Sequence, residues 1–266
     1  MKQFILEQEP DRQGRVRIEG SGYRYLVRVR RLAPGEYFPA LLPSSAKVAV
    51  RIVSIESNIL TGEIAPAVPG ETQNPSFHAP ALPPIYLYQA LPKSDKMDLI
   101  VRQAAEGAIA GIAPFVSEFS SAQPLLSNSQ KFLRWQKIVK EARQQCGSAI
   151  ATEVFQPAAI DALFARWEQL KSQKQGVIGL LFHHIPLAND SIHGYLGTWL
   201  KGRHEAAVIA IGPEGGFSPA EAERFIAAGF RPFTIGDTIL RTETAALYAA
   251  AAVRVILLEK DSWETK

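Results

Sequence analysis

The stretch IAIGPEGGFS, residues 209–218, joins an apolar run to a turn that has almost no side chains. A tight turn needs one residue that is free to adopt unusual φ values, and this turn has three glycines around a proline. It lacks the Lys-Ser/Thr pair of a P-loop and the Gly-x-Gly-x-x-Gly spacing of a dinucleotide fold. The stretch therefore predicts a site where a flat or bent ligand lies directly on backbone N–H and C=O groups.

The turn is followed by a clear helix start. Ser218 is suited to the N-cap position, Pro219 to the first helical position, and Glu221 completes a capping box. We therefore expect the turn to connect a buried strand to a helix.

A second stretch, FTIGDTILRTETAALYAAAAV at residues 233–253, repeats this arrangement. An apolar strand ends at Gly236, and a long helix opens near Thr242, which we expect to cap it, with Glu243 suited to the helix dipole. Arg241 puts a positive charge at the N-terminal end of this helix, where the helix dipole disfavours a cation. Its position indicates contact with a negatively charged or electron-rich ligand.

These turns belong to an alternation of strands and helices that begins at Ile85. We expect strands near 85–90, 110–115, 176–182, 206–211 and 232–235, and helices near 95–107, 128–147, 157–172, 191–202, 218–228 and 243–259. Such alternation predicts an α/β fold with a parallel sheet covered by helices. Ligands of such sheets bind at the carboxyl ends of the strands, where both turns would lie.

The first part of the chain has a different pattern, with short strands expected at 4–6, 37–41, 47–55 and 60–64. Period-two alternation in RVRIEGSGYRYLVRVRR predicts a further hairpin, which places Tyr23, Tyr25, Val27 and Val29 on one face and Arg24, Arg28 and Arg30 on the other. Residues 11–31 hold seven arginines against two acidic residues, a pattern that suits phosphate contacts. We expect a small β domain over 1–70, a proline-rich linker over 71–84 and the α/β domain over 85–266.

Composition narrows the class of protein. The chain has 266 residues, 47% of them hydrophobic, and a net charge of +3. Its single cysteine excludes an internal disulfide, and no apolar run is long enough to span a bilayer. We expect a cytoplasmic protein that binds no membrane.

The paired stretches IGPEGGFSPAEAERF and TIGDTILRTETAALYAAA resemble the signature of the SPOUT methyltransferases, in particular the RsmE group of 16S ribosomal RNA uridine-N3 methyltransferases. ALPKSDKMDLIVRQAAE and RWQKIVKEARQQ are similar to further motifs of that group. The resemblance implies a SPOUT-type trefoil-knot methyltransferase domain preceded by a small PUA-like β-barrel domain that binds RNA.

The resemblance also implies S-adenosylmethionine as the cofactor. By motif, its binding residues would be Leu181, Phe182, His183, Gly212, Pro213, Glu214, Gly215, Gly216, Ile235, Gly236, Ile239, Leu240, Thr244 and Ala245. The group is dimeric, which would suit an alanine-rich final helix, although Ala245, Ala246, Ala249, Ala250 and Ala252 would also suit ordinary core packing.

The implied substrate limits the chemistry. Uracil N3 carries a proton that must leave before or during attack on the methyl group, so a nearby positive charge should stabilise the developing anion. We assign that role to Arg241, while Glu243 is either the general base or a structural residue of the helix start. No metal is expected. The residues expected to contact the 16S rRNA of the 30S subunit are Arg15, Arg17, Arg24, Arg28, Arg30, Lys93 and Lys96.

Four positions on the expected substrate side depart from the group's usual residues: Gly107, Phe119, Ser148 and His184. Three hypotheses follow. The first is a uridine-N3 methyltransferase of the small subunit, and the second is a catalytically weak RNA-binding or ribosome-assembly protein of the same fold. The third is a SPOUT methyltransferase with another RNA target.

Overall fold

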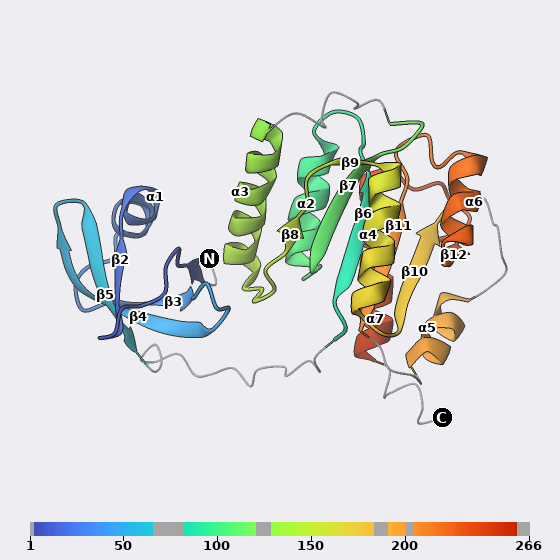
Figure 1. The fold of residues 1–266 in the computed structure, drawn as a ribbon. Coiled ribbons are helices and arrows are strands. Elements are labelled where there is room, and N and C mark those ends of the chain that lie inside the picture. Colours follow the sequence, from blue (N-terminus) through green and yellow to red (C-terminus); the bar gives the residue numbers. More distant parts are fainter. Residues whose placement is uncertain (1–2, 66–81, 121–128, 184–190, 201–204, 260–266) are drawn as a thin grey trace. The chain divides into compact units, whose positions relative to one another are not determined.

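The computed structural model describes residues 3–65, 82–120, 129–183, 191–200 and 205–259 (Figure 1). The chain divides into two compact units. One comprises Met1–Phe77 with Arg143–Ile150, and the other comprises His78–Ala142 with Ala151–Lys266. Residues 71–81 of the expected linker lie outside the described residues, so the domain boundaries 1–70, 71–84 and 85–266 stay a prediction.

The N-terminal unit is built on a five-stranded sheet with the order β1-β3-β4-β5-β2. Its strands are β1 (Phe4–Ile5), β2 (Arg15–Ile18), β3 (Tyr37–Leu41), β4 (Lys47–Glu56) and β5 (Ile59–Ala65). Phe38, Ile52 and Leu60 are fully buried in its core. The sheet is antiparallel except for the β1–β3 pair, and its strands confirm the predicted ones outside the arginine-rich segment.

The predicted hairpin is wrong in its second half. After β2 the chain forms α1 (Gly20–Tyr23), which continues into a π-helical segment, η1 (Arg24–Val29). Leu26 is fully buried, with Tyr23 and Val27 partly buried beside it. That spacing of three and four residues is helical, so the segment carries two apolar periods, and packing against the sheet selects the helical one.

The C-terminal unit is a parallel sheet with the order β12-β10-β11-β6-β7-β8, to which β9 adds beside β7. Its strands are β6 (Ile85–Ala90), β7 (Gly111–Val116), β8 (Glu153–Val154), β9 (Ala158–Ala159), β10 (Val177–Phe182), β11 (Ala206–Ile211) and β12 (Phe230–Phe233). The short β8 and β9 were not predicted. β12 begins earlier than predicted because Gly229, at φ +97°, turns the chain straight out of the preceding helix. Pro232 is tolerated in β12 because this strand forms an edge of the sheet.

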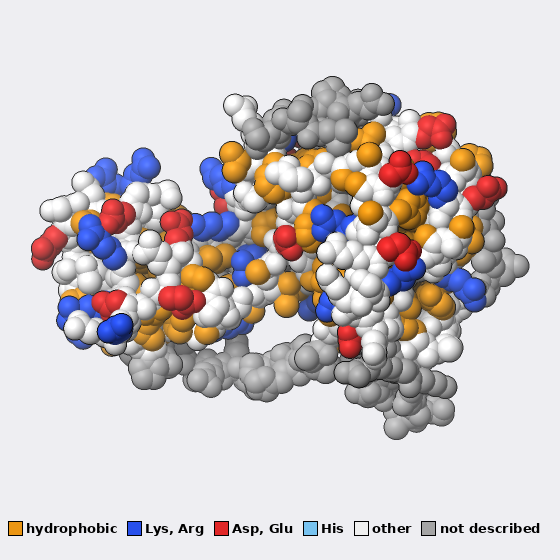
Figure 2. Space-filling view, in the orientation of Figure 1, with side chains coloured by type: hydrophobic (Ala, Val, Ile, Leu, Met, Phe, Trp, Pro, Cys, Tyr) orange, Lys and Arg blue, Asp and Glu red, His pale blue; other side chains and the backbone are white. Residues whose placement is uncertain are grey.

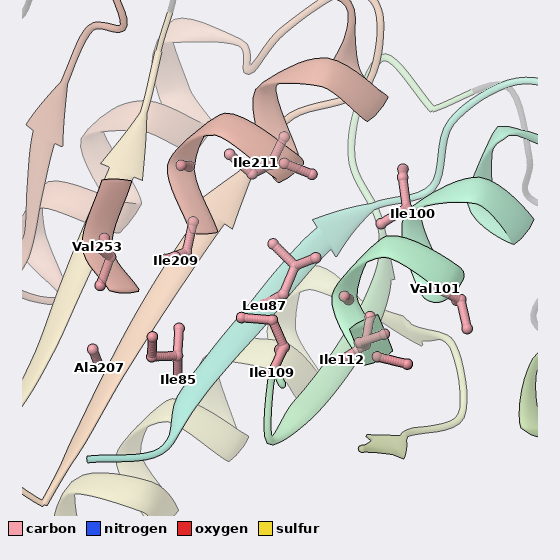
Figure 3. Close-up of a cluster of buried hydrophobic side chains, with 14 of the residues drawn as sticks. Ile85, Leu87, Ile100, Val101, Ile109, Ile112, Ala207, Ile209, Ile211 and Val253 are labelled. Carbon is pink, nitrogen blue, oxygen red and sulfur yellow. The ribbon is translucent and has the colours of Figure 1, made fainter. Parts of the chain in front are cut away.

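Helices cover both faces of this sheet (Figure 1). They are α2 (Lys96–Glu106), α3 (Ser129–Cys146), α4 (Ile160–Gln173), α5 (Ile192–Leu200), α6 (Pro219–Ala227) and α7 (Thr242–Leu258). Along β11 the side chains alternate between two cores: Ile209 packs toward α2 and α7 (Figure 3), and Val208 packs toward α4 and α6. The predicted parallel sheet covered by helices is confirmed.

The order of the strands brings the two sequence motifs together at the carboxyl ends of the strands. β10 and β11 are neighbours, and β12 lies on the other side of β10. Because these strands are parallel, the chain leaves their carboxyl ends side by side. From β12 the chain returns across the sheet to α7, which packs on α2, β6 and β11. Among the helices that the structure describes, none has the length and apolar character needed to cross a membrane.

Candidate functional site

The glycine turn predicted from the sequence lies between β11 and α6. Its helix start is as predicted: Ser218 Oγ accepts a hydrogen bond from the Glu221 N–H at 3.3 Å, and the Glu221 carboxylate accepts one from the Ser218 N–H at 3.0 Å. Gly216 has φ +73°, and its N–H donates to Pro213 O at 2.9 Å, which closes the turn. A methyl group on Gly212 would lie 3.0 Å from the backbone carbon of Gly216. The turn is therefore too tight for a side chain at Gly212, and its backbone conformation favours glycine at position 216.

The second turn runs from the end of β12 to the start of α7. Gly236 has φ +67°, a conformation that favours glycine. The N-cap of α7 is Arg241, whose side chain makes no capping hydrogen bond, so the prediction that Thr242 caps the helix is wrong. Thr242 is instead the first residue of the helix, and its buried hydroxyl makes tertiary hydrogen bonds.

A cavity of about 200 Å³ lies between these two turns and the end of β10. Its lining residues are Phe182, His183, Ile211, Gly212, Pro213, Glu214, Gly215, Gly216, Phe217, Thr234, Ile235, Thr238, Ile239, Leu240, Thr242 and Ala245. The sequence-predicted residues are therefore brought together with few exceptions. Leu181 points into the core on the α4 side, and neither Gly236 nor Thr244 is part of the lining.

Some lining residues were missed by the sequence motifs: Ile211, Phe217, Thr234, Thr238 and Thr242. Each lies beside a predicted residue in one of the two turns. Thr242 was singled out only as a cap. Its role in the cavity wall could not be predicted from its neighbours in the sequence, because its hydrogen-bond partners, Gln89 and Gly212, come from distant parts of the chain.

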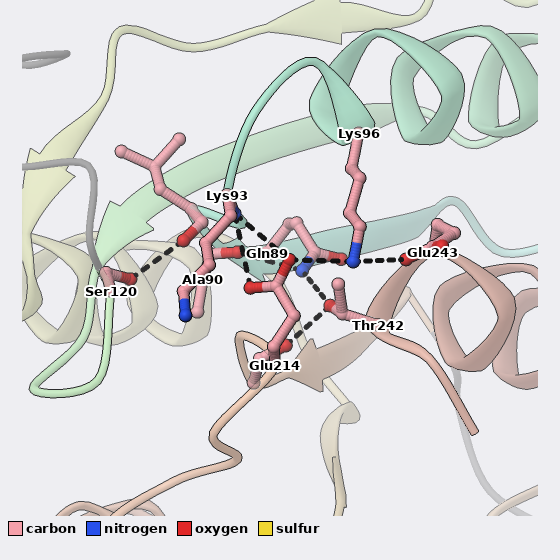
Figure 4. Close-up of polar contacts among 10 residues, drawn as sticks. Gln89, Ala90, Lys93, Lys96, Ser120, Glu214, Thr242 and Glu243 are labelled. Atoms are coloured by element: carbon pink, nitrogen blue, oxygen red, sulfur yellow. Dashed lines mark hydrogen bonds and ion pairs between the residues drawn. The ribbon is translucent and has the colours of Figure 1, made fainter.

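A chain of buried hydrogen bonds fixes the glycine turn to α7 and β6 (Figure 4). Thr242 Oγ1 donates to Gly212 O at 2.6 Å and accepts from Gln89 Nε2 at 3.0 Å. Because an amide NH₂ can only donate, the hydroxyl proton must point to Gly212 O. The Gln89 amide is held in turn by Ala90 O at 2.9 Å. The orientation of the Gly212 carbonyl at the cavity wall is thus set by side chains at the carboxyl end of the sheet.

A charged cluster braces the same turn from outside (Figure 4). Lys96 Nζ lies 2.8 Å from Glu214 Oε1 and 3.5 Å from Glu243 Oε2, and the Lys93 N–H donates to both oxygens of Glu214. The Lys96 ammonium is therefore directed at carboxylates, whereas the sequence predicted that it contacts RNA. The Lys93 side chain is exposed.

The charged cluster shifts the pKa values of two of its members, Lys96 and Glu214. The hydrogen bond to Glu214 raises the pKa of Lys96 above its ordinary 10.5, against a smaller effect of desolvation. Burial of Glu214 favours its neutral form, but hydrogen bonds from Lys96 and from backbone N–H groups outweigh it and lower its pKa below 4.5. Glu214 is therefore ionised at neutral pH on the wall of the cavity.

We expect Glu214→Gln to lower the free energy of unfolding at neutral pH. Since the pKa of Glu214 is depressed in the folded state, its stabilising contribution is present above pH 4.5 and is lost as the pH falls through the folded-state pKa. Urea unfolding of the wild type and of Glu214→Gln should therefore give free energies of unfolding that differ at neutral pH and become equal in acid. Glu223→Gln, which changes an exposed carboxylate of α6, serves as the control. If the difference in free energy of unfolding between wild type and Glu214→Gln were the same in acid, ionised Glu214 would not be its source.

The two residues predicted to act in catalysis flank the cavity. Arg241 is exposed and follows Leu240, which lines the cavity. The Glu243 side chain is 14% exposed, and its Oε2, though close to Lys96, has no hydrogen-bond partner among the described residues. Neither side chain is part of the lining, although their neighbours Leu240 and Thr242 are.

The arginines predicted to contact RNA are exposed, but they differ in their partners. Arg15 pairs with Glu63 at 3.5 Å and Arg17 pairs with Glu19. Arg28 donates to Asn58 Oδ1 at 3.4 Å. Arg15 and Arg17 lie on β2, whereas Arg24 and Arg28 lie on η1 and Arg30 directly follows it. Figure 2 shows Lys and Arg side chains at several points on the surface of this unit.

The alanines of α7 serve several purposes. Ala246 and Ala249 are buried in the core, whereas Ala245 lines the cavity. Ala250 lines a second, apolar cavity of about 280 Å³ between α2 and α7, together with Leu247, Val255, Ile100 and Gly107 among others. The helix therefore combines ordinary core packing with an apolar surface.

The four positions that depart from the group's usual residues fall in different places. Gly107 caps the carboxyl end of α2, Phe119 is exposed beside Gly215, and Ser148 belongs to the N-terminal unit. His184 lies outside the described residues.

Comparisons with known proteins agree with the sequence motifs. Residues 80–254 match the family model described as an RNA methyltransferase domain. Ribosomal RNA small subunit methyltransferase E of Synechocystis is 28% identical over 88% of this chain and 70% of its own length. The corresponding protein of Buchnera aphidicola subsp. Schizaphis graminum is 30% identical over 64% of this chain and 65% of its own length. Ribosomal RNA small subunit methyltransferase E 2 of Borreliella burgdorferi is 27% identical over 97% of this chain and 98% of its own length.

Solved structures share the fold. Ribosomal RNA small subunit methyltransferase E of Neisseria gonorrhoeae, bound to S-adenosyl methionine, is 25% identical and aligns over 96% of this chain and 98% of its own, with a TM-score of 0.74. A probable rRNA-methyltransferase of Porphyromonas gingivalis, 20% identical, aligns over 97% and 98% with a TM-score of 0.73. The expected fold class, a SPOUT-type methyltransferase domain preceded by a PUA-like β domain, is confirmed. The chain therefore belongs to the family of RNA methyltransferases.

Proposed function

We propose that this protein transfers the methyl group of S-adenosylmethionine to N3 of one uridine in the 16S rRNA of the small ribosomal subunit. The observation that carries the proposal is the cavity at the carboxyl edge of the parallel sheet, where the glycine turn leaves the backbone uncovered. Membership of the RNA methyltransferase family and the relatives named for small-subunit rRNA support it.

The lining fits S-adenosylmethionine. Backbone groups of Gly212, Gly215 and Gly216 suit the polar parts of the cofactor, and Ile235, Ile239, Leu240 and Ala245 offer an apolar wall to its adenine. The Glu214 carboxylate favours a cationic ligand. When bound, the cofactor supplies an activated methyl group on a sulfonium, which is also a good leaving group. We assign its binding to the predicted residues, among which Leu181, Gly236 and Thr244 adjoin lining residues in the sequence.

The chain's own residues would act on the proton and charge of the uracil. As the N3 proton leaves, negative charge develops on the ring, and the exposed Arg241 guanidinium beside the cavity would stabilise it. Glu243 is the candidate base, and Lys96 positions its carboxylate. The remaining rate enhancement would come from alignment of the two reactants.

The proposed partner is the 30S subunit, whose location would place the protein in the cytoplasm. Contacts to its rRNA are assigned to the arginines of the N-terminal unit and to Lys93, with Lys96 acting within the charged cluster. We further propose a homodimer in which the apolar surface of α2 and α7 is covered by a second copy, because Leu247 and Val255 are exposed there.

Transfer of labelled methyl groups tests the function. The protein and labelled S-adenosylmethionine are incubated with 30S subunits from a strain that lacks the protein, and the modified nucleotide is mapped. Label on N3 of a single uridine supports the proposal. Cofactor binding without transfer to RNA would favour a binding protein of the same fold, and label at another atom or nucleotide would favour another target.

The arginines of η1 give a separate prediction for RNA binding. Replacing Arg24, Arg28 and Arg30 together by alanine should weaken binding to 16S rRNA and flatten the plot of log K against log salt by about 2 units, at about 0.7 per lost phosphate contact. Filter binding at several salt concentrations measures the slope. Replacing Arg15 and Arg17, which already pair with acidic residues, should flatten it less. An unchanged slope for the triple variant would remove these arginines from the interface.

A further inference from the structure

The turn that follows β7 is held unusually firmly beside the cavity. Ser120 N–H donates to Ser117 O at 2.9 Å, and Ser120 Oγ donates to Leu91 O at 3.0 Å. On the other side, Glu221 accepts from the Glu118 N–H at 2.9 Å and from Ser117 Oγ at 3.3 Å. The capping carboxylate of α6 therefore ties this turn to the start of the helix that follows the glycine turn.

Phe119 lies within this fixed turn, and its side chain is 46% exposed. By contrast, Phe115 at the end of β7 and Phe217 after the glycine turn are both buried and stack with ring centroids 6.3 Å apart. Phe119 thus leaves much of a large apolar surface in water, in a turn whose hydrogen bonds fix its position. Burial in the core does not explain this placement.

The ring is in direct contact with the cavity wall. A methyl group on Gly215 would lie 2.9 Å from Cβ and 3.3 Å from the first ring carbon of Phe119, so only glycine fits there. Gly215 itself lines the cavity. Gly215, which lines the cavity, is therefore also the direct neighbour of an exposed aromatic ring.

We infer that Phe119 is a stacking platform for a nucleobase of the RNA beside the glycine turn of the cavity wall. The inference rests on the proposed function and adds a positioning residue to it. Uracil N3 lies on the edge that pairs in a duplex, so it can be methylated only when the base is unpaired and out of the stack. An aromatic side chain replaces the lost stacking, and proteins that bind unpaired RNA use such rings for this purpose.

The test compares rings with an aliphatic side chain of similar size. Phe119→Leu keeps apolar bulk but loses the π face, whereas Phe119→Tyr and Phe119→Trp keep it. Ile226→Ala, which removes a 42% exposed apolar side chain from the last turn of α6, is the matched control. For each protein we would measure S-adenosylmethionine affinity by calorimetry, affinity for a 16S rRNA transcript by filter binding, and kcat/KM for methyl transfer to 30S subunits.

Phe119→Leu should leave cofactor affinity unchanged and lower RNA affinity and kcat/KM by about 5- to 150-fold, the range for loss of one base–aromatic stack. The Tyr and Trp variants should restore both. A Leu variant equal to wild type in RNA affinity and kcat/KM would overturn the inference while leaving the proposed function intact. If wild type binds RNA but transfers no methyl group, the proposed function fails, and the RNA affinities of the variants still decide the role of Phe119. If wild type neither binds RNA nor transfers a methyl group, both fail.

Discussion

Replacing Arg241 by alanine should lower the rate constant for methyl transfer by about 10²- to 10³-fold, the effect of removing one group that stabilises charge in a transition state. Cofactor affinity should stay close to that of wild type, because the Arg241 side chain is not part of the cavity lining. Single-turnover transfer to 30S subunits measures the rate constant directly, and calorimetry measures the affinity. Arg241→Lys should be intermediate, since it retains the charge but loses the planar fork.

The structure separates this effect from a loss of stability. Arg241 is the N-cap of α7, makes no capping hydrogen bond and is exposed. A cation there opposes the helix dipole, so its removal should leave the melting temperature unchanged or slightly higher. Arg102→Ala, which changes another exposed arginine, is the control for a general loss of charge. A variant that keeps its stability and also keeps its rate would exclude Arg241 from catalysis.

Local features were predictable from the sequence wherever neighbouring residues determine them. The capping box of Ser218 and Glu221 depends on contacts within one helical turn, and it formed as predicted. The segment around Leu26 was mispredicted because its residues satisfy both a strand and a helix period, and only packing against the sheet decides between them.

Contacts between distant segments could not be predicted from the sequence motifs. Thr242 has the residue type of a cap, yet its hydroxyl bonds to Gly212 O, because a buried carbonyl needs a donor. Lys96 has the residue type of an RNA contact, yet the fold places Glu214 and Glu243 around its ammonium. The motifs located the cavity, whereas the groups that fix its walls depend on which loops the strand order brings together.

Gly212→Ala is the change that should most impair cofactor binding. The added methyl group would lie 3.0 Å and 3.1 Å from the carbonyl carbon and Cα of Gly216 and 3.2 Å from Phe217 N, all of them backbone atoms. The turn can relieve these contacts only by opening, which would also disturb the Thr242 hydrogen bond. If the turn opens to relieve the overpacking and must close again to hold the cofactor, the cost of about 1–3 kcal/mol is met on binding. The affinity for S-adenosylmethionine, measured by calorimetry, should then fall by about 5- to 150-fold.

A second glycine gives the matched control. Gly197 lies within α5 and a methyl group there would meet nothing within 4 Å. Because glycine is unfavourable inside a helix, Gly197→Ala should leave affinity unchanged and raise the free energy of unfolding by about 0.5–1 kcal/mol. The same chemical change should therefore lower cofactor affinity at Gly212 and leave it unchanged at Gly197. Equal affinities for Gly212→Ala and Gly197→Ala would mean that the glycine turn does not form the cofactor site, since a wall that moves without affecting the ligand cannot be holding it.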